Sequence, residues 1–334
     1  MRVLLLLGGA ACLAFACATP SSGRPSSSAA ASALPSPAQA QLDAGNLLEA
    51  ATLFSQSCQQ NPNQHRAECL QAGALWVELQ AWEEAERVLK PIANPLGEGA
   101  SLEACFLLAL SHYERGQLER VAALLKPIAQ RKQLEEHWRL RAQTEYAICL
   151  LEQGKRDEAQ SLLREVASVS PPPVEESEKT TWAKAKFFLA EIAFLHFAQS
   201  PFCNPCSVHL MAQDVEKKAQ LLLDAQELFL QTIQTRNNYW AIAAGMRIGE
   251  LYETLYQQLL SSPLPLEINP EGEAAYRKEM RTFLRGLLAN ALQNYEDTLY
   301  TAERIGTTGF FAKRTREKLL HLTQQLLDSP EELR

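Results

Sequence analysis

One helical hairpin signature recurs along the first half of the chain and constrains the fold more than any other feature. Its four copies begin at Gly45, Gln80, Gly116 and Gly154, which lie 35, 36 and 38 residues apart. Each copy opens a leucine-rich segment with helical periodicity. A two-helix repeat of this length predicts a solenoid, in which every unit packs mainly on its neighbours. A non-repetitive helical bundle is the alternative.

Small residues occupy matching places in the two helices of each unit. Gly73 and Ala85 hold these places in the second unit, and Ala147 and Ala159 hold them in the fourth. A small side chain lets two antiparallel helices approach closely where they cross. The pattern resembles the tetratricopeptide repeat, which has small residues at positions 8 and 20 and larger ones at 11 and 24.

The resemblance implies an all-α fold, a right-handed α-solenoid of about six helix pairs with a C-terminal capping helix. Four units span residues 41–170, and looser pairs and the cap span 174–328. Two units share the string LKPIA, which places Pro91 and Pro127 inside second helices. Proline removes a backbone donor and clashes with the preceding turn, so we expect these helices to kink or end early.

The first helices of this family line a concave groove that holds a protein or peptide partner. Carried over position by position, the resemblance predicts a groove that is apolar with an acidic edge. Phe106 and Tyr113 would be aromatic anchors, Arg141 would clamp a carboxylate or carbonyl, and position 13 would form a glutamate ladder. The predicted partner-binding residues are Leu70, Glu78, Phe106, Tyr113, Glu114, Arg141, Ile148 and Glu152.

The N-terminus has the layout of a bacterial export signal, with Arg2 followed by the apolar run 3–15. Processing after residue 16 would resemble the lipoprotein pattern, in which Cys17 becomes acylated; simple secretion and an uncleaved anchor are the alternatives. Residues 17–40 are rich in serine, alanine and proline and predict a disordered tether. We therefore expect a cell-envelope location, with an outer-membrane lipoprotein facing the periplasm as the leading hypothesis.

The cysteines are compatible with an oxidising compartment. Cys203 and Cys206 form a C-x-x-C motif flanked by His196 and His209, so a short disulfide, free thiols and a zinc site all remain open. A hairpin could also bring Cys58 and Cys69 together, provided that both side chains point inward. These four cysteines are the disulfide candidates, and we predict no metal site.

Catalytic motifs and a basic stripe are both missing from the sequence. It contains no phosphate-binding glycine loop, no metalloprotease motif and no nucleophile elbow, and its net charge is -7. We expect a non-enzymatic scaffold or adaptor without cofactor or nucleic acid, similar in layout to repeat lipoproteins that help assemble outer-membrane barrels or pilus secretins. The alternative function is a metal- or redox-responsive module built on the loop of Cys203 and Cys206.

Overall fold

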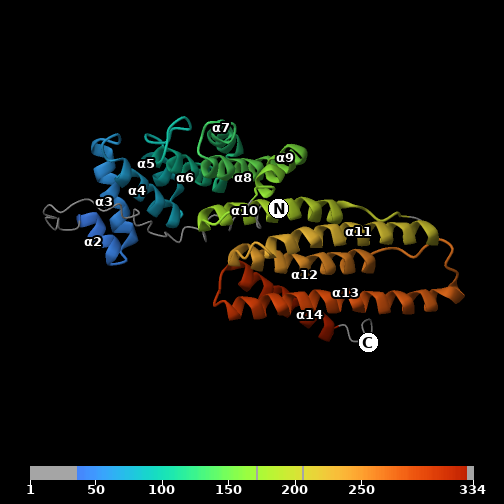
Figure 1. Ribbon diagram of the computed structural model, residues 1–334. Coiled ribbons are helices and arrows are strands. Elements are labelled where there is room, and N and C mark those ends of the chain that lie inside the picture. The colour runs from blue at the N-terminus through green and yellow to red at the C-terminus, as the bar shows by residue number, and fades with distance from the viewer. Residues whose placement is uncertain (1–35, 171, 205–206, 329–334) are drawn as a thin grey trace. The chain divides into compact units, whose positions relative to one another are not determined.

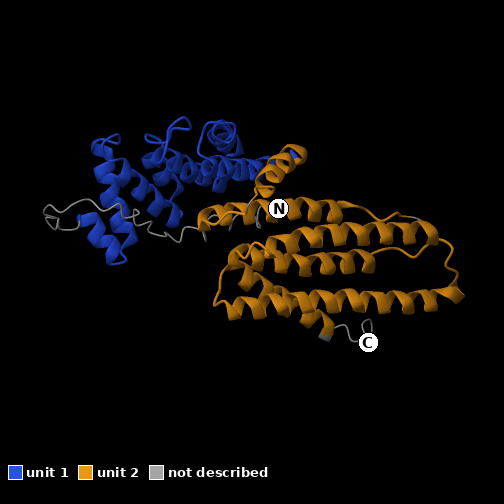
Figure 2. Cartoon of the chain, in the orientation of Figure 1, with its two compact units in different colours: residues 1–155 blue, residues 156–334 orange. Residues whose placement is uncertain are grey.

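The computed structural model describes residues 36–170, 172–204 and 207–328, and within them the chain is all-helical, with consecutive helices packed on one another. The chain divides into two compact units, residues 1–155 and 156–334 (Figure 2). The boundary falls inside the fourth predicted repeat, between its two helices. None of the described helices is long and apolar enough to cross a membrane.

Unit 1 is a series of short helices, each packed on the next along the chain (Figure 1). First helices of successive repeats also touch, since α4 packs on α6 and α6 on α8. This is the neighbour-to-neighbour packing expected of stacked hairpins. Its helices are α2 (Pro37–Asp43), α3 (Leu47–Gln60), α4 (Arg66–Glu78), α5 (Trp82–Leu89), α6 (Ala100–Glu114), α7 (Leu118–Ala129) and α8 (Glu136–Glu152).

The residues that begin the four sequence copies are the turns of the hairpins. Gly45, Gly116 and Gly154 have φ values of 78°, 71° and 80°, and Gln80 has the same left-handed conformation at 57°. In each case the next amide donates to a carbonyl five residues earlier, such as that of Ala81 to Trp76 at 2.8 Å. This is a Schellman-type helix end, which favours glycine because a side chain is strained there. The repeat period is therefore the spacing of one backbone turn.

The start of the first helix corrects one sequence expectation, and the two prolines predicted inside second helices have different outcomes. The tether was predicted to reach residue 40, but α2 begins at Pro37, where Ser36 caps the helix and proline fits its first turn. The α5 helix ends at Leu89, before Pro91, as expected. The α7 helix does not end early, because it continues through Pro127 to Ala129.

Unit 2 is built from longer helices. In Figure 1, α10, α11, α12 and α13 run alongside one another, and α14 packs on α12 and α13. Phe187, Phe229, Trp240 and Phe311, from four different helices, form its aromatic core. The helices are α9 (Arg156–Ala167), α10 (Glu176–Gln199), α11 (Val208–Ile233), α12 (Asn238–Leu260), α13 (Pro270–Arg304) and α14 (Phe310–Asp328).

The same close helix crossing occurs in both units. A Cβ atom added at Gly73 on α4 would overlap Leu89 on α5, and one added at Gly249 on α12 would overlap the ring of Tyr295 on α13. Ala85, Ala159 and Ala291, which hold the partner position on the second helices, are fully buried. Glycine is thus required at these crossings for space and not for backbone conformation.

Alanine substitutions should separate crossing glycines from other helical glycines. We expect Gly249→Ala to lower the free energy of unfolding by about 1–3 kcal/mol, because the buried ring of Tyr295 must move to admit the methyl group. Gly286→Ala on α13 is the matched control, since nothing lies within 4 Å of its Cβ position. Its helix propensity should raise stability by roughly 1 kcal/mol. Urea denaturation of both variants measures the difference, and equal effects would refute the crossing.

Candidate partner-binding surface

Four predicted residues on α4 and α6 are accessible, and Leu110 on α6 is accessible as well. We call these five residues the first-helix surface: Leu70, Glu78, Leu110, Tyr113 and Glu114. Glu78 is exposed, and the other four side chains are half-buried. Glu152 and Arg141 on α8 are half-buried as well, whereas Phe106 and Ile148 are buried. The predicted partner-binding residues therefore differ in how much of each side chain is exposed to a partner.

Phe106 is not the exposed anchor that the sequence suggested, because it is only 5% exposed. Its ring stacks on Trp138 at 5.8 Å between centroids, and the Arg141 guanidinium lies 4.1 Å above it. The pattern missed this because Trp138 lies outside the family's groove positions. Phe106 belongs to the packing between α6 and α8.

Arg141 is likewise not an open clamp. It makes a two-pronged ion pair with Glu103, at 2.6 and 3.2 Å, which links the first helices of successive repeats. The planar guanidinium is held by hydrogen bonds to a carboxylate and by a cation–π contact with an aromatic ring. We interpret Glu103, Phe106, Trp138 and Arg141 as a staple between repeats.

Tyr113 is the aromatic residue of the first-helix surface, and its side chain is half-buried. Burial raises the pKa of its hydroxyl, and the carboxylates of Glu152, Glu114 and Glu145 raise that pKa further. Burial also raises the pKa of Glu114. The hydroxyl of Tyr113 therefore stays a neutral hydrogen-bond donor, in a negative potential that favours a positively charged partner.

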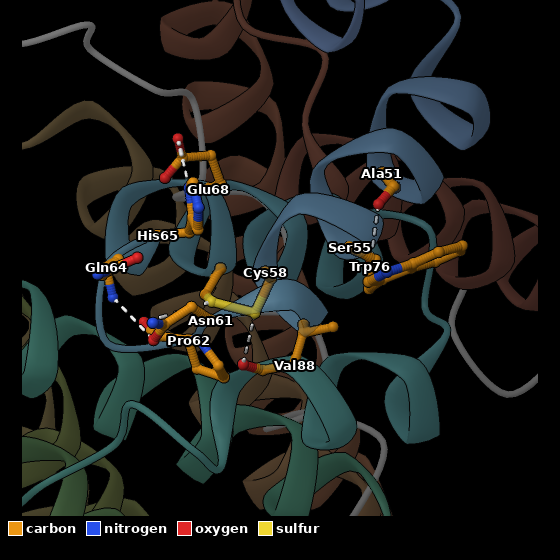
Figure 3. Close-up of a disulfide and its surroundings, with 11 residues drawn as sticks. Ala51, Ser55, Cys58, Asn61, Pro62, Gln64, His65, Glu68, Trp76 and Val88 are labelled. Atoms are coloured by element: carbon orange, nitrogen blue, oxygen red, sulfur yellow. Dashed lines mark hydrogen bonds and ion pairs between the residues drawn. A yellow bond between two sulfur atoms is a disulfide. The ribbon is translucent and has the colours of Figure 1, made fainter.

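A disulfide joins Cys58 at the end of α3 to Cys69 in α4 (Figure 3). Both half-cystines are buried. Farther along the same hairpin, the indole of Trp76 donates to the Ser55 hydroxyl at 2.8 Å. The disulfide and this hydrogen bond join α3 to α4 at two separate points along the helices. Together they stabilise the packing of the first repeat on the second.

The other cysteines divide into two kinds. Cys105 and Cys149 are free and buried, and burial raises their pKa values to about 12 and about 11. Cys203 is disulfide-bonded, while Cys206 lies outside the described residues. A disulfide sulfur is not a thiolate ligand, which counts against the zinc alternative. Among the residues that the structure does describe, no group of three or more histidine, cysteine or carboxylate side chains could hold a metal.

Unit 2 contains a buried ion-pair network that the sequence reasoning missed: Glu191, Arg247, Glu250, Glu253 and Lys318. Arg247 on α12 donates two hydrogen bonds to Glu191 on α10, at 2.5 and 2.6 Å, and one to Glu250 at 2.5 Å. Lys318 on α14 contacts Glu250 at 3.3 Å and Glu253 at 3.2 Å. An arginine within the apolar run AGMRIGELYE was the available signal.

Burial governs the protonation of this network. It raises the pKa of Glu191, against the opposing attraction of Arg247. Burial alone would lower the pKa of Arg247, but Glu191 and Glu250 together hold that pKa above its ordinary value. Tyr295 on α13 donates to Glu253 at 2.6 Å, and both burial and Glu253 raise the tyrosine pKa. The network therefore ties α10, α12, α13 and α14 together.

Lys218 on α11 is a buried lysine only 1% exposed. Its ammonium donates to the Phe197 carbonyl at 3.1 Å and to the Gln258 side chain at 2.5 Å, without an ion pair among the described residues. Burial lowers the pKa of Lys218 to about 8, although Asp214 partly opposes this. The charged form of Lys218 is thus less favoured in the folded protein than in the unfolded chain.

Lys218 should make stability depend on pH in the alkaline range. Between about 8 and the ordinary value of 10.5 the unfolded chain keeps the proton that the folded chain releases, so stability rises with pH across that window. Below about pH 8, Lys218 is protonated in both the folded and the unfolded chain. The free-energy cost of burying its charge then does not change with pH. We expect the stability of the wild type minus that of Lys218→Met to increase from pH 7 to pH 9.5 in urea denaturation. A difference independent of pH would refute the assignment.

Comparison with known proteins adds no family. No protein-family model matches the sequence, and a search of curated proteins gives no match.

Proposed function

We propose that the chain is a tetratricopeptide-type, right-handed solenoid of about six helix pairs and a cap, and that its first-helix surface binds a basic, partly apolar segment of a protein partner. In this proposal it acts as a non-enzymatic adaptor. The staple of Glu103, Phe106, Trp138 and Arg141 holds the repeats in register, and the half-buried side chains of Leu70, Leu110 and Tyr113 are the anchors for the partner.

The repeat assignment is supported by positions and not by helix content alone. Gly73 meets Leu89 as Gly249 meets Tyr295, which are positions 8 and 24 of the family's pattern in two repeats far apart in the sequence. The left-handed turn residue also returns at each hairpin of unit 1. An unrelated helical bundle would have to match both features by chance: the glycine contact at the helix crossing and the spacing of the left-handed turns.

The binding proposal is carried by the environment of Tyr113. A half-buried aromatic ring with a permanent donor offers apolar area and a hydrogen bond at once, which is the composition of interface hot spots. Three carboxylates raise the pKa of this hydroxyl through their negative charge. Opposite charge on a partner would speed association and select against acidic segments.

An envelope location is part of the proposal. The disulfide between Cys58 and Cys69, together with the disulfide-bonded Cys203, is typical of proteins that mature in an oxidising compartment. The predicted export signal and Cys17, the predicted site of lipidation, lie outside the described residues. Fractionation of cells that make Cys17→Ser tests the anchor: the variant should move to the soluble fraction, and its retention in membranes would remove the lipid from the proposal.

Peptide display tests the binding chemistry directly. Random peptides selected on the purified protein should be enriched in lysine or arginine beside an apolar residue. Binding of the enriched peptides should weaken by roughly tenfold in the double variant Glu78→Gln, Glu114→Gln, the scale of a lost interaction with a charged group. Glu49→Gln, Glu119→Gln is the matched control, because both residues are exposed on second helices. Equal weakening in both double variants, or enrichment of acidic peptides, would contradict the proposal.

A further inference from the structure

Beside the ion-pair network, unit 2 has a hollow of about 380 Å³ that is open to solvent, which we call the cavity. Its volume is within the range of small-molecule sites. Residues of α10, α12 and α14 line it, and it is distinct from the first-helix surface. The lining residues are Phe194, Arg247, Glu250, Glu253, Thr254, Gln257, Gln258 and Lys318.

The network carries more negative than positive groups. Three carboxylates, those of Glu191, Glu250 and Glu253, surround the two cations Arg247 and Lys318. All but Lys318 have nearly buried side chains. An uncompensated charge in such a place is costly, so the arrangement favours either one added proton or one added cation.

The hydrogen bonds indicate which kind of ligand the cavity can accept. The guanidinium of Arg247 is engaged by Glu191 and Glu250, and the ammonium of Lys318 is shared by Glu250 and Glu253, so both cations are already matched to carboxylates. An anion would have to break these pairs. Glu253 is different, because both hydrogen bonds that it accepts within the described residues end on its Oε2 atom. Its Oε1 atom can accept a bond from a donor in the cavity.

We propose that this cavity binds an organic cation, a guanidinium or primary ammonium group, which Glu253 receives through Oε1. The group would supply the positive charge that the network lacks and would form a charge-assisted hydrogen bond. The side chains of Thr254 and Gln257 add neutral polar groups, and the ring of Phe194 adds an apolar wall. The cation belongs either to a free small molecule or to a side chain of a bound peptide. This proposal does not depend on peptide binding by unit 1.

Calorimetric titration with simple probes tests the cavity. Butylguanidinium and butylammonium, each at constant ionic strength, should bind saturably, whereas neutral 1-butanol should not bind. Glu253→Gln should weaken binding of the cations by roughly tenfold or more, because the charged acceptor is lost while an acceptor for Tyr295 remains. Glu273→Gln is the matched control, since Glu273 pairs with Arg277 on the outside of α13; this variant should bind as the wild type does.

A second variant keeps the test decisive if Glu253→Gln does not fold. Gln257 lines the cavity and is exposed, so Gln257→Lys adds a positive charge at low risk to folding. It should weaken cation binding, and Gln293→Lys on the exposed side of α13 should not. The tripeptide acetyl-Gly-Arg-Gly-amide separates the two sources: its binding at the same site indicates a peptide side chain, and its exclusion indicates a free molecule. Absence of saturable binding by both probes, or binding unchanged in Glu253→Gln and Gln257→Lys, would overturn the proposal.

Discussion

Replacing Arg247 with methionine should lower the free energy of unfolding by about 3–5 kcal/mol, the largest effect that we expect of any single substitution. The side chain of Arg247 is 7% exposed, and it is the shared partner of Glu191 and Glu250. Methionine fills a similar volume but donates no hydrogen bond, so the buried carboxylate of Glu191 loses its counter-charge and that of Glu250 keeps only Lys318. The loss arises from the carboxylates left behind and not from the removed arginine itself.

An exposed pair on the same unit provides the control. Arg277 contacts Glu273 at 2.7 Å, but their side chains are 59% and 39% exposed. Arg277→Met should therefore change stability by less than about 1 kcal/mol. Urea denaturation followed by circular dichroism compares the two variants, and adding Glu191→Gln to Arg247→Met should recover part of the loss. A loss below about 1 kcal/mol in Arg247→Met would contradict the burial argument.

Removing the disulfide of unit 1 should have the next largest effect. The bridge closes a loop with a sequence separation of 11, for which loss of chain entropy in the unfolded state predicts about 3 kcal/mol of stabilisation. The double variant Cys58→Ser, Cys69→Ser should lose that amount relative to the oxidised wild type. Two serines are chosen because one remaining thiol could form wrong bridges.

A reductant distinguishes this bridge from the one at Cys203. Treatment with dithiothreitol should destabilise the wild type through both sites, whereas in the double variant only the contribution of Cys203 remains. Denaturation curves of both proteins with and without the reductant give the two contributions separately. Equal sensitivity of wild type and double variant to the reductant would show that the bridge between α3 and α4 does not stabilise the fold.

The all-helical fold, with consecutive helices packed on one another, was predictable because its signals are local. The left-handed turn favours glycine, so Gly45, Gly116 and Gly154 mark three hairpin turns in the sequence itself. The helix crossing needs a small residue, which makes Gly73 recognisable by its spacing from the turn at Gln80. The unit boundary was not predictable, since the two helices of the fourth repeat look like the others in the sequence.

The site was less predictable because its contacts are distant in the sequence. Glu103 and Arg141 lie 38 residues apart, and Glu191 and Arg247 lie 56 apart. The groove positions of the family pattern indicate which side of its own repeat a side chain faces. They do not indicate which residue of the next repeat covers that side chain. The groove pattern therefore predicts an anchor at Phe106, whereas Arg141 and Trp138 cover its ring in the structure.

Site-specific photo-crosslinking in the cells that make the protein tests the central claim most directly. A benzophenone amino acid is placed at Tyr113 or Leu70 on the first-helix surface, and at Arg87, an exposed position on the second helix α5, as the control. We predict a discrete protein adduct from the first two positions that is lost in the double variant Glu78→Gln, Glu114→Gln, and none from Arg87. Adducts that form equally at Arg87, or at Arg87 alone, would contradict the account.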